Sequence, residues 1–292
     1  MGKRILCASL FVFFLLAGAL HCLAAAGEKP PKKAILLVAF GTSVIEAQKS
    51  FNVIETEVKK SFPGVETRWA FESRIIRTKL AKEGKVFLSP ESALAQLMDE
   101  GYTQVAVLSL QTIPGVEFHR LNQNARLFGQ MVGGFDKIRI AWPLLSSHED
   151  MERAAKAMLK NIPAERKPQD AVLLMGHGTE KHPSDAIYLA MYGILQELDP
   201  NVFLATVEGY PSINAVVPKL KEKKVKKVYL VPFMAVAGDH ARNDMSGNKP
   251  DSWKSVLDKE GFTCEAVLKG TAEYPEIVDI WIDHLREIFD RL

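Results

Sequence analysis

Three side chains in the second half of the chain have the residue types and spacing of a metal site. Each follows an apolar run typical of a buried strand: His177 follows AVLLM, Glu208 follows VFLATV, and His240 follows KKVYLVPF and a short loop. The intervals between them are 31 and 32 residues, about one strand–helix unit each. Consecutive parallel strands would bring the three side chains to one edge of one sheet. Two imidazoles and a carboxylate suit a borderline divalent metal such as Co, Fe, Ni or Zn.

Each of these residues also has an ordinary structural explanation. A single His at a strand end is commonly structural, Glu208 would cap the turn GYP, and His240 would be an exposed loop residue. The matched spacing favours the metal site over three unrelated roles. Other motifs fit less well: GHGTEK has Lys181 in place of the third glycine of a dinucleotide fingerprint, no GxSxG elbow is present, and His177 and His182 lack the HExxH pattern of zincins. We expect His182 to face solvent at the start of the next helix.

The elements that must position this site alternate between strand-like and helix-like segments. The expected strands are 34–40, 66–72, 104–110, 137–142, 171–175, 202–207, 226–233 and 265–270. The expected helices are 44–60, 89–101, 117–130, 146–160 with a capping box at Ser146 and Glu149, 185–198, 216–222 and 275–292. Strand runs without polar alternation, separated by helices, predict parallel sheets covered on both faces.

The two halves of the chain resemble each other. AILLVAFGTS near the start matches AVLLMGHGTE in pattern and partly in letters. The expected fold class is therefore α/β, with two similar Rossmann-like domains whose parallel sheets are flanked by helices. The domains are expected at 33–142 and 143–274, with the metal site in the second and a cleft between them. The amphipathic helix at 275–292 is expected to pack on the first domain.

The N-terminus has the layout of a secretory signal peptide. Lys3 and Arg4 precede a long apolar run that ends in small residues, so we expect residues 1–26 to be removed and the protein to be exported to the periplasm. The alternative is an uncleaved membrane anchor. Cleavage lowers the 37 basic side chains to 35, which balance the 35 acidic ones and give no reason to expect nucleic-acid binding. Only Cys264 would remain, which excludes an intrachain disulfide.

Three motifs in the same order resemble those of a known enzyme family. LLMGHGTEKHPSDAIY, TVEGYPS and VPFMAVAGDHARNDMSG, together with AFGTS and AFESRIIRTKL, are similar to the anaerobic, single-subunit class II cobaltochelatases of the ferrochelatase-like family. That family inserts Co²⁺ into sirohydrochlorin. The resemblance extends over most of residues 33–292. It implies a bilobal chelatase-like fold with the macrocycle between the lobes, His177 and His240 as catalytic metal-binding residues, and Glu208 as the matching carboxylate.

The chemistry of chelation suits these residue types. Two pyrrole N–H protons are replaced by a divalent metal, so the site must both bind the ion and accept protons. Neutral imidazole does both, and a carboxylate lowers the cost of bringing a dication into the site. The glycines beside His177 are interpreted as room for a flat macrocycle. The expected function is insertion of Co²⁺ or Fe²⁺ into sirohydrochlorin or a related tetrapyrrole, in cobalamin or porphyrin biosynthesis. The alternative is an exported metal- or tetrapyrrole-binding carrier without turnover.

Two further expectations concern partners. His119, in GVEFHRL, is a hypothetical axial haem ligand or a bridge between subunits, with a plain surface position as the alternative. The apolar stripe of 275–292 suggests a homo-oligomer, although the same helix would also serve to close its own domain. After signal cleavage no integral membrane segment is expected. The sequence leaves the choice between cobalt and iron open.

Overall fold

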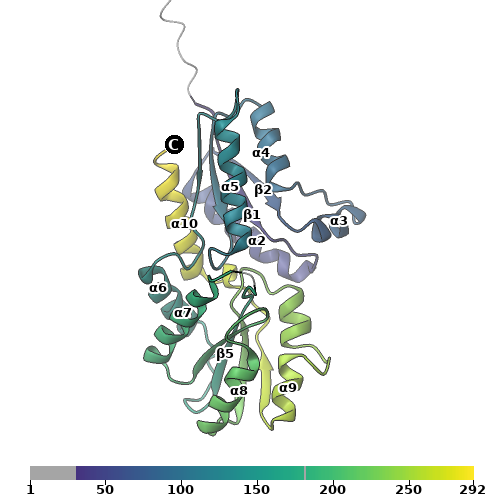
Figure 1. Cartoon of the computed structure of the whole chain (residues 1–292), viewed down its shortest axis with the longest axis vertical. Coiled ribbons are helices and arrows are strands. Elements are labelled where there is room, and N and C mark those ends of the chain that lie inside the picture. The colour runs from purple at the N-terminus through teal and green to yellow at the C-terminus, as the bar shows by residue number, and fades with distance from the viewer. Residues whose placement is uncertain (1–30, 181) are drawn as a thin grey trace, which may run out of the picture. The chain divides into compact units, whose positions relative to one another are not determined.

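The computed structural model describes residues 31–180 and 182–292, and residues 33–292 form one compact unit. This unit contains two four-stranded sheets, both entirely parallel (Figure 1). The first has the strand order β2-β1-β3-β4 and the second β6-β5-β7-β8, so each half of the chain repeats one topology. The predicted fold class of two similar α/β halves is confirmed. The predicted signal peptide, 1–26, lies outside the described residues.

The strands are β1 (Lys33–Ala39), β2 (Glu66–Phe71), β3 (Gln104–Ser109), β4 (Lys137–Ile140), β5 (Ala171–Gly176), β6 (Val202–Thr206), β7 (Lys227–Pro232) and β8 (Thr263–Ala266). The α-helices are α2 (Lys49–Ser61), α3 (Arg74–Lys82), α4 (Pro90–Asp99), α5 (Val116–Gln130), α6 (His148–Lys160), α7 (Asp185–Leu198), α8 (Ile213–Glu222), α9 (Trp253–Lys259) and α10 (Pro275–Phe289). Short 3₁₀ turns cover Ile45–Gln48 (η1) and Thr271–Glu273 (η3), and a π-helical turn covers His240–Met245 (η2).

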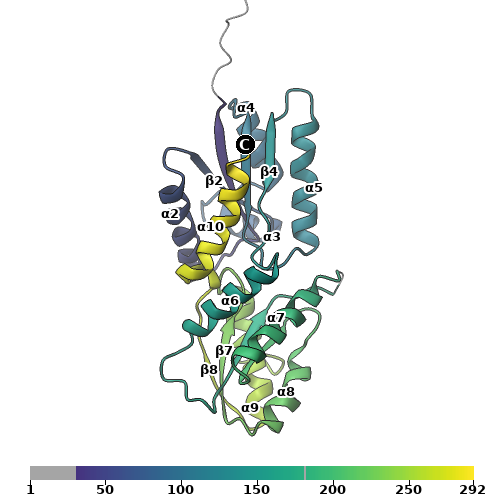
Figure 2. The ribbon, with the colours of Figure 1, turned by 90° about the vertical axis from the view of Figure 1, so that its left-hand side faces the viewer.

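The first sheet is covered on both faces because alternate side chains of its buried strands point in opposite directions. Leu36 and Val107 belong to the core that α4 and α5 cover. Ile35 and Leu108 belong to the core on the opposite face. Helices α2 and α10 lie on this face of the sheet (Figure 2). The C-terminal helix α10 packs on β3, β4 and α2, and also on α6. Strands buried on both faces explain the apolar runs without alternation.

The second sheet follows the same rule. Leu173 and Leu230 pack with α8 and α9 on one face. On the other face, Leu174 and Tyr229 join α6 and α7 in the core cluster that also contains Ile35 and the buried residues of α10. One continuous apolar core therefore extends from the first sheet to the second, through α6 and α10.

The structure corrects several local expectations. Helix α6 is capped by Ser147, whose Oγ accepts a hydrogen bond from the Asp150 backbone N at 3.1 Å, whereas the hydroxyl of Ser146 donates to the Pro143 carbonyl. Helices α3 and α9 were not anticipated, and β8 begins two residues earlier than expected. His240 opens a helical turn, whereas the ordinary structural explanation placed it in an exposed loop. Short elements have weak periodicity, so tertiary contacts decide their bounds.

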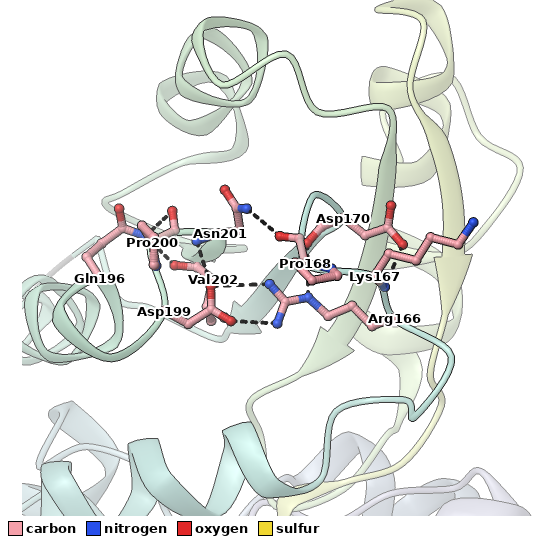
Figure 3. Close-up of polar contacts among 9 residues, drawn as sticks. All are labelled: Arg166, Lys167, Pro168, Asp170, Gln196, Asp199, Pro200, Asn201 and Val202. Atoms are coloured by element: carbon pink, nitrogen blue, oxygen red, sulfur yellow. Dashed lines mark hydrogen bonds and ion pairs between the residues drawn. The ribbon is translucent and has the colours of Figure 1, made fainter.

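A polar network fixes the amino ends of β5 and β6 (Figure 3). Arg166 donates to both carboxylate oxygens of Asp199, at 2.6 and 3.2 Å, and to the backbone carbonyl of Asp170 at 3.0 Å. Asn201 Nδ2 donates to the Pro168 carbonyl at 2.7 Å. These contacts hold the turns that lead into the two strands. They lie at the sheet edge opposite to the carboxyl ends, where His177 and Glu208 emerge.

Candidate functional site

His177 directly follows β5, at the carboxyl edge of the second sheet. Its ring is half-buried, and its Nδ1 lies 2.9 Å from the backbone carbonyl oxygen of Gly178. A carbonyl oxygen can only accept a hydrogen bond, so Nδ1 carries the proton in this contact. The lone pair of the neutral ring is therefore on Nε2, which is the nitrogen available to a metal ion.

His240 is held in the same tautomer by a carboxylate. Its Nδ1 lies 2.6 Å from Oδ2 of Asp244, one helical turn further along η2. The Nδ1–H donates to this oxygen, and the lone pair of the neutral ring is again on Nε2. The side chain of His240 retains 34% exposure.

The two rings lie next to each other. Their centroids are 4.9 Å apart and their planes are inclined by 83°. His177 comes from the end of β5 and His240 from the segment after β7, the strand that pairs with β5. The prediction that parallel strand ends would bring these two histidines together agrees with this geometry. Two imidazoles with engaged Nδ1 and open Nε2 form an incomplete, nitrogen-based ligand pair.

Glu208 is beside His177 through its backbone. The Glu208 N–H donates to the His177 carbonyl at 2.8 Å, and the carboxylate side chain is exposed. Across residues 31–180 and 182–292, no three His, Cys, Asp or Glu side chains are grouped so as to hold a metal ion. The fold thus brings the two imidazoles together and places the Glu208 loop beside them, and the role of its carboxylate stays a prediction.

The glycines that flank His177 have a different role from the one the sequence suggested. Gly178 has φ +80°, and a Cβ there would lie 1.6 Å from the Glu208 carbonyl oxygen. A Cβ on Gly176 would lie 2.7 Å from the ring of Tyr188. The glycines are therefore needed for packing within the protein, and the interpretation that they leave room for a substrate is wrong. The space is occupied by protein atoms that pack directly against the His177 loop.

Tyr188 supports the His177 loop from the core. Its ring is fully buried in α7, and its hydroxyl interacts with the backbone of His177 and Gly178 and with the hydroxyl of Thr112. Burial raises the pKa of this phenol, so it stays neutral. Thr112 follows β3 in the first half of the chain, and its Oγ1 also lies 3.5 Å from the Phe233 carbonyl. The segment after β3 therefore reaches the site that the second sheet builds.

A second titratable group lies at the carboxyl edge of the first sheet. Glu72 directly follows β2, and its Oε2 accepts a hydrogen bond from Gln111 Nε2 at 2.6 Å. Burial raises the pKa of its carboxyl to about 7, Gln111 and Arg120 lower it, and Glu117 raises it. The group lines a cavity of about 140 Å³ whose other walls are Arg77, Ser89, Pro90, Glu91, Arg120 and Leu121. Glu72 stands in the motif AFESRIIRTKL, but its protonation was not expected from the sequence.

The rings of His119 and His182 form a second pair of neighbouring imidazoles. His119 is exposed on α5, and its ring centroid is 5.0 Å from that of His182, which is half-buried, in contrast to the solvent-facing position expected for it. Nδ1 of His182 accepts a hydrogen bond from the Ser184 backbone N at 3.2 Å. His119 also lines a pocket of about 270 Å³ formed by residues of α5 alone. Its haem-binding role stays a prediction.

Comparison with known proteins identifies the family. The sequence model of the family described as cobalt chelatase (CbiK) matches residues 33–290. The chain belongs to this family. The sirohydrochlorin cobaltochelatase CbiKC of Nitratidesulfovibrio vulgaris is 42% identical over 254 residues, which cover 87% of this chain and 89% of the relative. The sirohydrochlorin cobaltochelatase of Salmonella typhimurium is 32% identical over 258 residues, covering 88% and 96%.

Solved structures with lower identity share the fold. SirB from Bacillus subtilis, solved with Fe³⁺, superposes with a TM-score of 0.59 at 17% identity, over 88% of this chain and 95% of that one. CbiX, a terminal enzyme of sirohaem biosynthesis in denitrifying bacteria, gives a TM-score of 0.53 at 14% identity, over 87% and 98%. These likenesses establish the chelatase-type architecture of the two sheets.

Three supporting residues of the site were missed by the sequence reasoning. Asp244 fixes the tautomer of His240, Tyr188 supports the His177 loop, and Asp185 accepts hydrogen bonds from two site loops. For Asp244 a signal existed, because it stands four residues after His240 and so on the same face of a helical turn. No helix was predicted for this segment, so the four-residue spacing did not single Asp244 out. The contacts of Asp185 and Tyr188 depend on how α7 packs.

Proposed function

We propose that this protein is a sirohydrochlorin chelatase, a lyase of tetrapyrrole biosynthesis that inserts Co²⁺ into its substrate, with Fe²⁺ as the second candidate metal. The observation that carries the proposal is the pair of imidazoles, 4.9 Å apart, that present open Nε2 atoms at one sheet edge. Membership of the cobalt chelatase family supports the same reaction, and the two relatives described above are named for it.

Metal binding and proton removal are both assigned to the histidines of the site. Sirohydrochlorin loses two pyrrole protons and gains one dication, so the site must deliver the metal and remove two protons. The Nε2 lone pairs of His177 and His240 bind the arriving ion, and each accepts a proton once the ion has left for the ring. The hydrogen bonds to Gly178 and Asp244 keep both Nε2 atoms available. The Glu208 carboxylate, on the adjoining loop, adds negative charge that favours the dication.

An incomplete ligand set suits a metal that must be released. A closed tetrahedral site with thiolates would hold the ion as a permanent component. Two neutral nitrogens with one exposed carboxylate nearby bind more weakly, and the four pyrrole nitrogens of the substrate then compete successfully. The metal is a substrate of the reaction in this proposal.

The direct test is metal insertion by the purified protein. Sirohydrochlorin is incubated anaerobically with Co²⁺, and in parallel with Fe²⁺, while the change in its visible absorbance is followed. A rate well above the protein-free control supports the chelatase. A rate equal to that control, with folded protein, refutes it and leaves the carrier hypothesis, which nothing in the structure favours.

The site assignment is tested with single substitutions. His177→Ala and His240→Ala each remove one Nε2 ligand, and we expect each to lower the insertion rate by at least about a hundredfold. His148→Ala is the matched control, since His148 is exposed at the start of α6 and its Nε2 lies 3.3 Å from Oε1 of Glu152. Wild-type rates in both site variants would show that the residues are misassigned even if the protein is active.

We propose further that the protein acts outside the cytoplasm, on the basis of the signal-like N-terminus. In the described part of the chain, no helix is both long and apolar enough to cross a membrane. Cell fractionation followed by N-terminal sequencing decides the point: a mature chain beginning near residue 25 or 27 in the periplasmic fraction supports export, and an intact Met1 in the cytosol contradicts it.

We also propose that the protein self-associates and that His119 binds haem. Sedimentation measures the oligomeric state. Haem binding predicts a Soret absorbance band in the purified protein that His119→Ala removes, while a haem-free wild-type protein that does not take up added haemin would rule it out.

A further inference from the structure

Asp185 joins the two loops that carry His177 and Glu208. Its Oδ1 accepts a hydrogen bond from the Thr179 backbone N at 2.8 Å, and its Oδ2 accepts one from the Tyr210 backbone N at 2.9 Å. Thr179 stands two residues after His177, and Tyr210 two residues after Glu208. One carboxylate therefore holds both loops at equivalent positions relative to their site residues.

The two loops are also packed directly on each other. The Glu208 N–H donates to the His177 carbonyl at 2.8 Å, and the Glu208 carbonyl oxygen occupies the place that a side chain on Gly178 would need. A Cβ on Gly209 would lie 1.9 Å from Oδ2 of Asp185, so the Asp185 carboxylate occupies the space that a side chain at this position would need. The Asp185 carboxylate is thus in close contact with both loops, at the place where they pack on each other.

The position of Asp185 at the start of α7 suits a carboxylate that holds two loops together. It is the first residue of the 14-residue helix α7, where the unpaired backbone N–H groups stabilise negative charge. The carboxylate is anchored to a helix that packs in the core through Tyr188 and Met191. Each of its two oxygens accepts a hydrogen bond from a backbone N–H of a different loop, so the carboxylate bridges the two loops.

We propose that Asp185 is a positioning residue for metal transfer, which sets the placement of His177 relative to Glu208 through the Thr179 and Tyr210 backbone amides. Hydrogen bonds to a carboxylate are stronger and shorter than neutral ones, so two of them define the distance between loops that have no regular secondary structure. Displacement of a reacting group by about 1 Å can lower a rate a hundredfold. The inference rests on the proposed function for its kinetic test, but not for its binding test.

Asp185→Ala removes both acceptors, and we expect the KM for Co²⁺ to rise at least tenfold while the KM for sirohydrochlorin changes less than twofold. Asp185→Asn retains one carbonyl oxygen and turns its NH₂ towards the other backbone N–H, so it should also raise the KM for Co²⁺. Glu149→Ala is the matched control: this exposed residue is an acidic group in the first turn of α6. We expect it to leave both constants unchanged.

A binding measurement without sirohydrochlorin separates this inference from the proposed function. Co²⁺ is titrated into wild type, Asp185→Ala and Glu149→Ala, and the visible ligand-field bands of the bound ion are recorded, with circular dichroism as the check on folding. Weaker binding and altered bands at saturation in Asp185→Ala alone support the positioning role. Wild-type binding and bands in a folded Asp185→Ala protein, or an equal rise in both KM values, overturn it. If Asp185→Ala does not fold, Asp185→Asn is judged by the same criteria. A wild type that binds Co²⁺ but inserts none would refute the proposed function, and the titration alone would then decide the role of Asp185.

Discussion

Replacement of Glu72 by glutamine should stabilise the protein in a strongly pH-dependent manner. Burial raises the pKa of this carboxyl from its ordinary value of 4.5 to about 7. Between these two pH values the unfolded chain loses its proton while the folded protein keeps it, so the wild type loses stability as the pH rises. Above pH 7 the penalty is complete. A pKa difference of this size corresponds to about 3 kcal/mol of unfolding free energy.

Glutamine has nearly the same shape as glutamic acid and carries no charge at any pH. Its carbonyl can still accept the hydrogen bond from Gln111, so Glu72→Gln removes the cost of ionisation without removing that contact. We therefore expect the variant to be more stable than wild type by about 3 kcal/mol at pH 8.5, and by under about 1 kcal/mol at pH 5. The charged groups around this carboxyl, Arg77, Arg120, Glu117 and Glu91, are unchanged in both proteins.

The assay is equilibrium unfolding in urea at several pH values between 5 and 9, with secondary structure as the signal. Glu83→Gln is the control, because Glu83 is an exposed residue at the end of α3 in the same half of the molecule. We expect no pH-dependent gain from it. If the gain from Glu72→Gln is the same at pH 5 and pH 8.5, or if it is absent at pH 8.5, the carboxyl is not held neutral by burial and the reasoning fails.

Two further predictions concern the site loops. Asp244→Asn should lower the initial rate of metal insertion by about ten- to a hundredfold, because an amide can turn its NH₂ towards Nδ1 of His240 and favour the tautomer with hydrogen on Nε2. The exposed Asp258→Asn is the control. An unchanged rate in Asp244→Asn would count against the tautomer argument. Gly178→Ala should lower the unfolding free energy by more than about 1 kcal/mol and abolish insertion, since φ is +80° and the new Cβ would meet the Glu208 carbonyl. Gly84→Ala has a similar φ of +79° with nothing within 4 Å, so it should show the backbone penalty with normal activity, and equal activity losses in both variants would contradict this account.

Much of the architecture could be predicted because it follows from local sequence patterns. The apolar runs that become β1, β3, β5 and β7 are buried on both faces, and this produces a signal that needs no knowledge of neighbours. Parallel strands connected by helices have their carboxyl ends at one sheet edge, so the approach of His177 and His240 also follows from their positions after β5 and β7.

The short and irregular elements could not be predicted in this way. The helical turn at His240 has six residues, and its partner contact with Asp244 exists only because that turn forms. The cap of α6 is Ser147, one residue after the predicted Ser146, because the Ser146 hydroxyl donates to the Pro143 carbonyl. In such segments the local preferences of neighbouring alternatives are nearly equal, and contacts from distant parts of the chain decide between them.

The sequence by itself thus determined the two parallel sheets, the family, and the pair of histidines at a strand edge, because these depend on residue type and on periodicity along the chain. Only the tertiary structure decided what each of these groups can do. It assigned the open Nε2 atoms through Gly178 and Asp244, and it raised the pKa of Glu72 by burial. It also joined two loops through Asp185. Tautomer, protonation and loop placement depend on atoms within a few ångströms in space, and those atoms come from residues that the sequence order does not bring together.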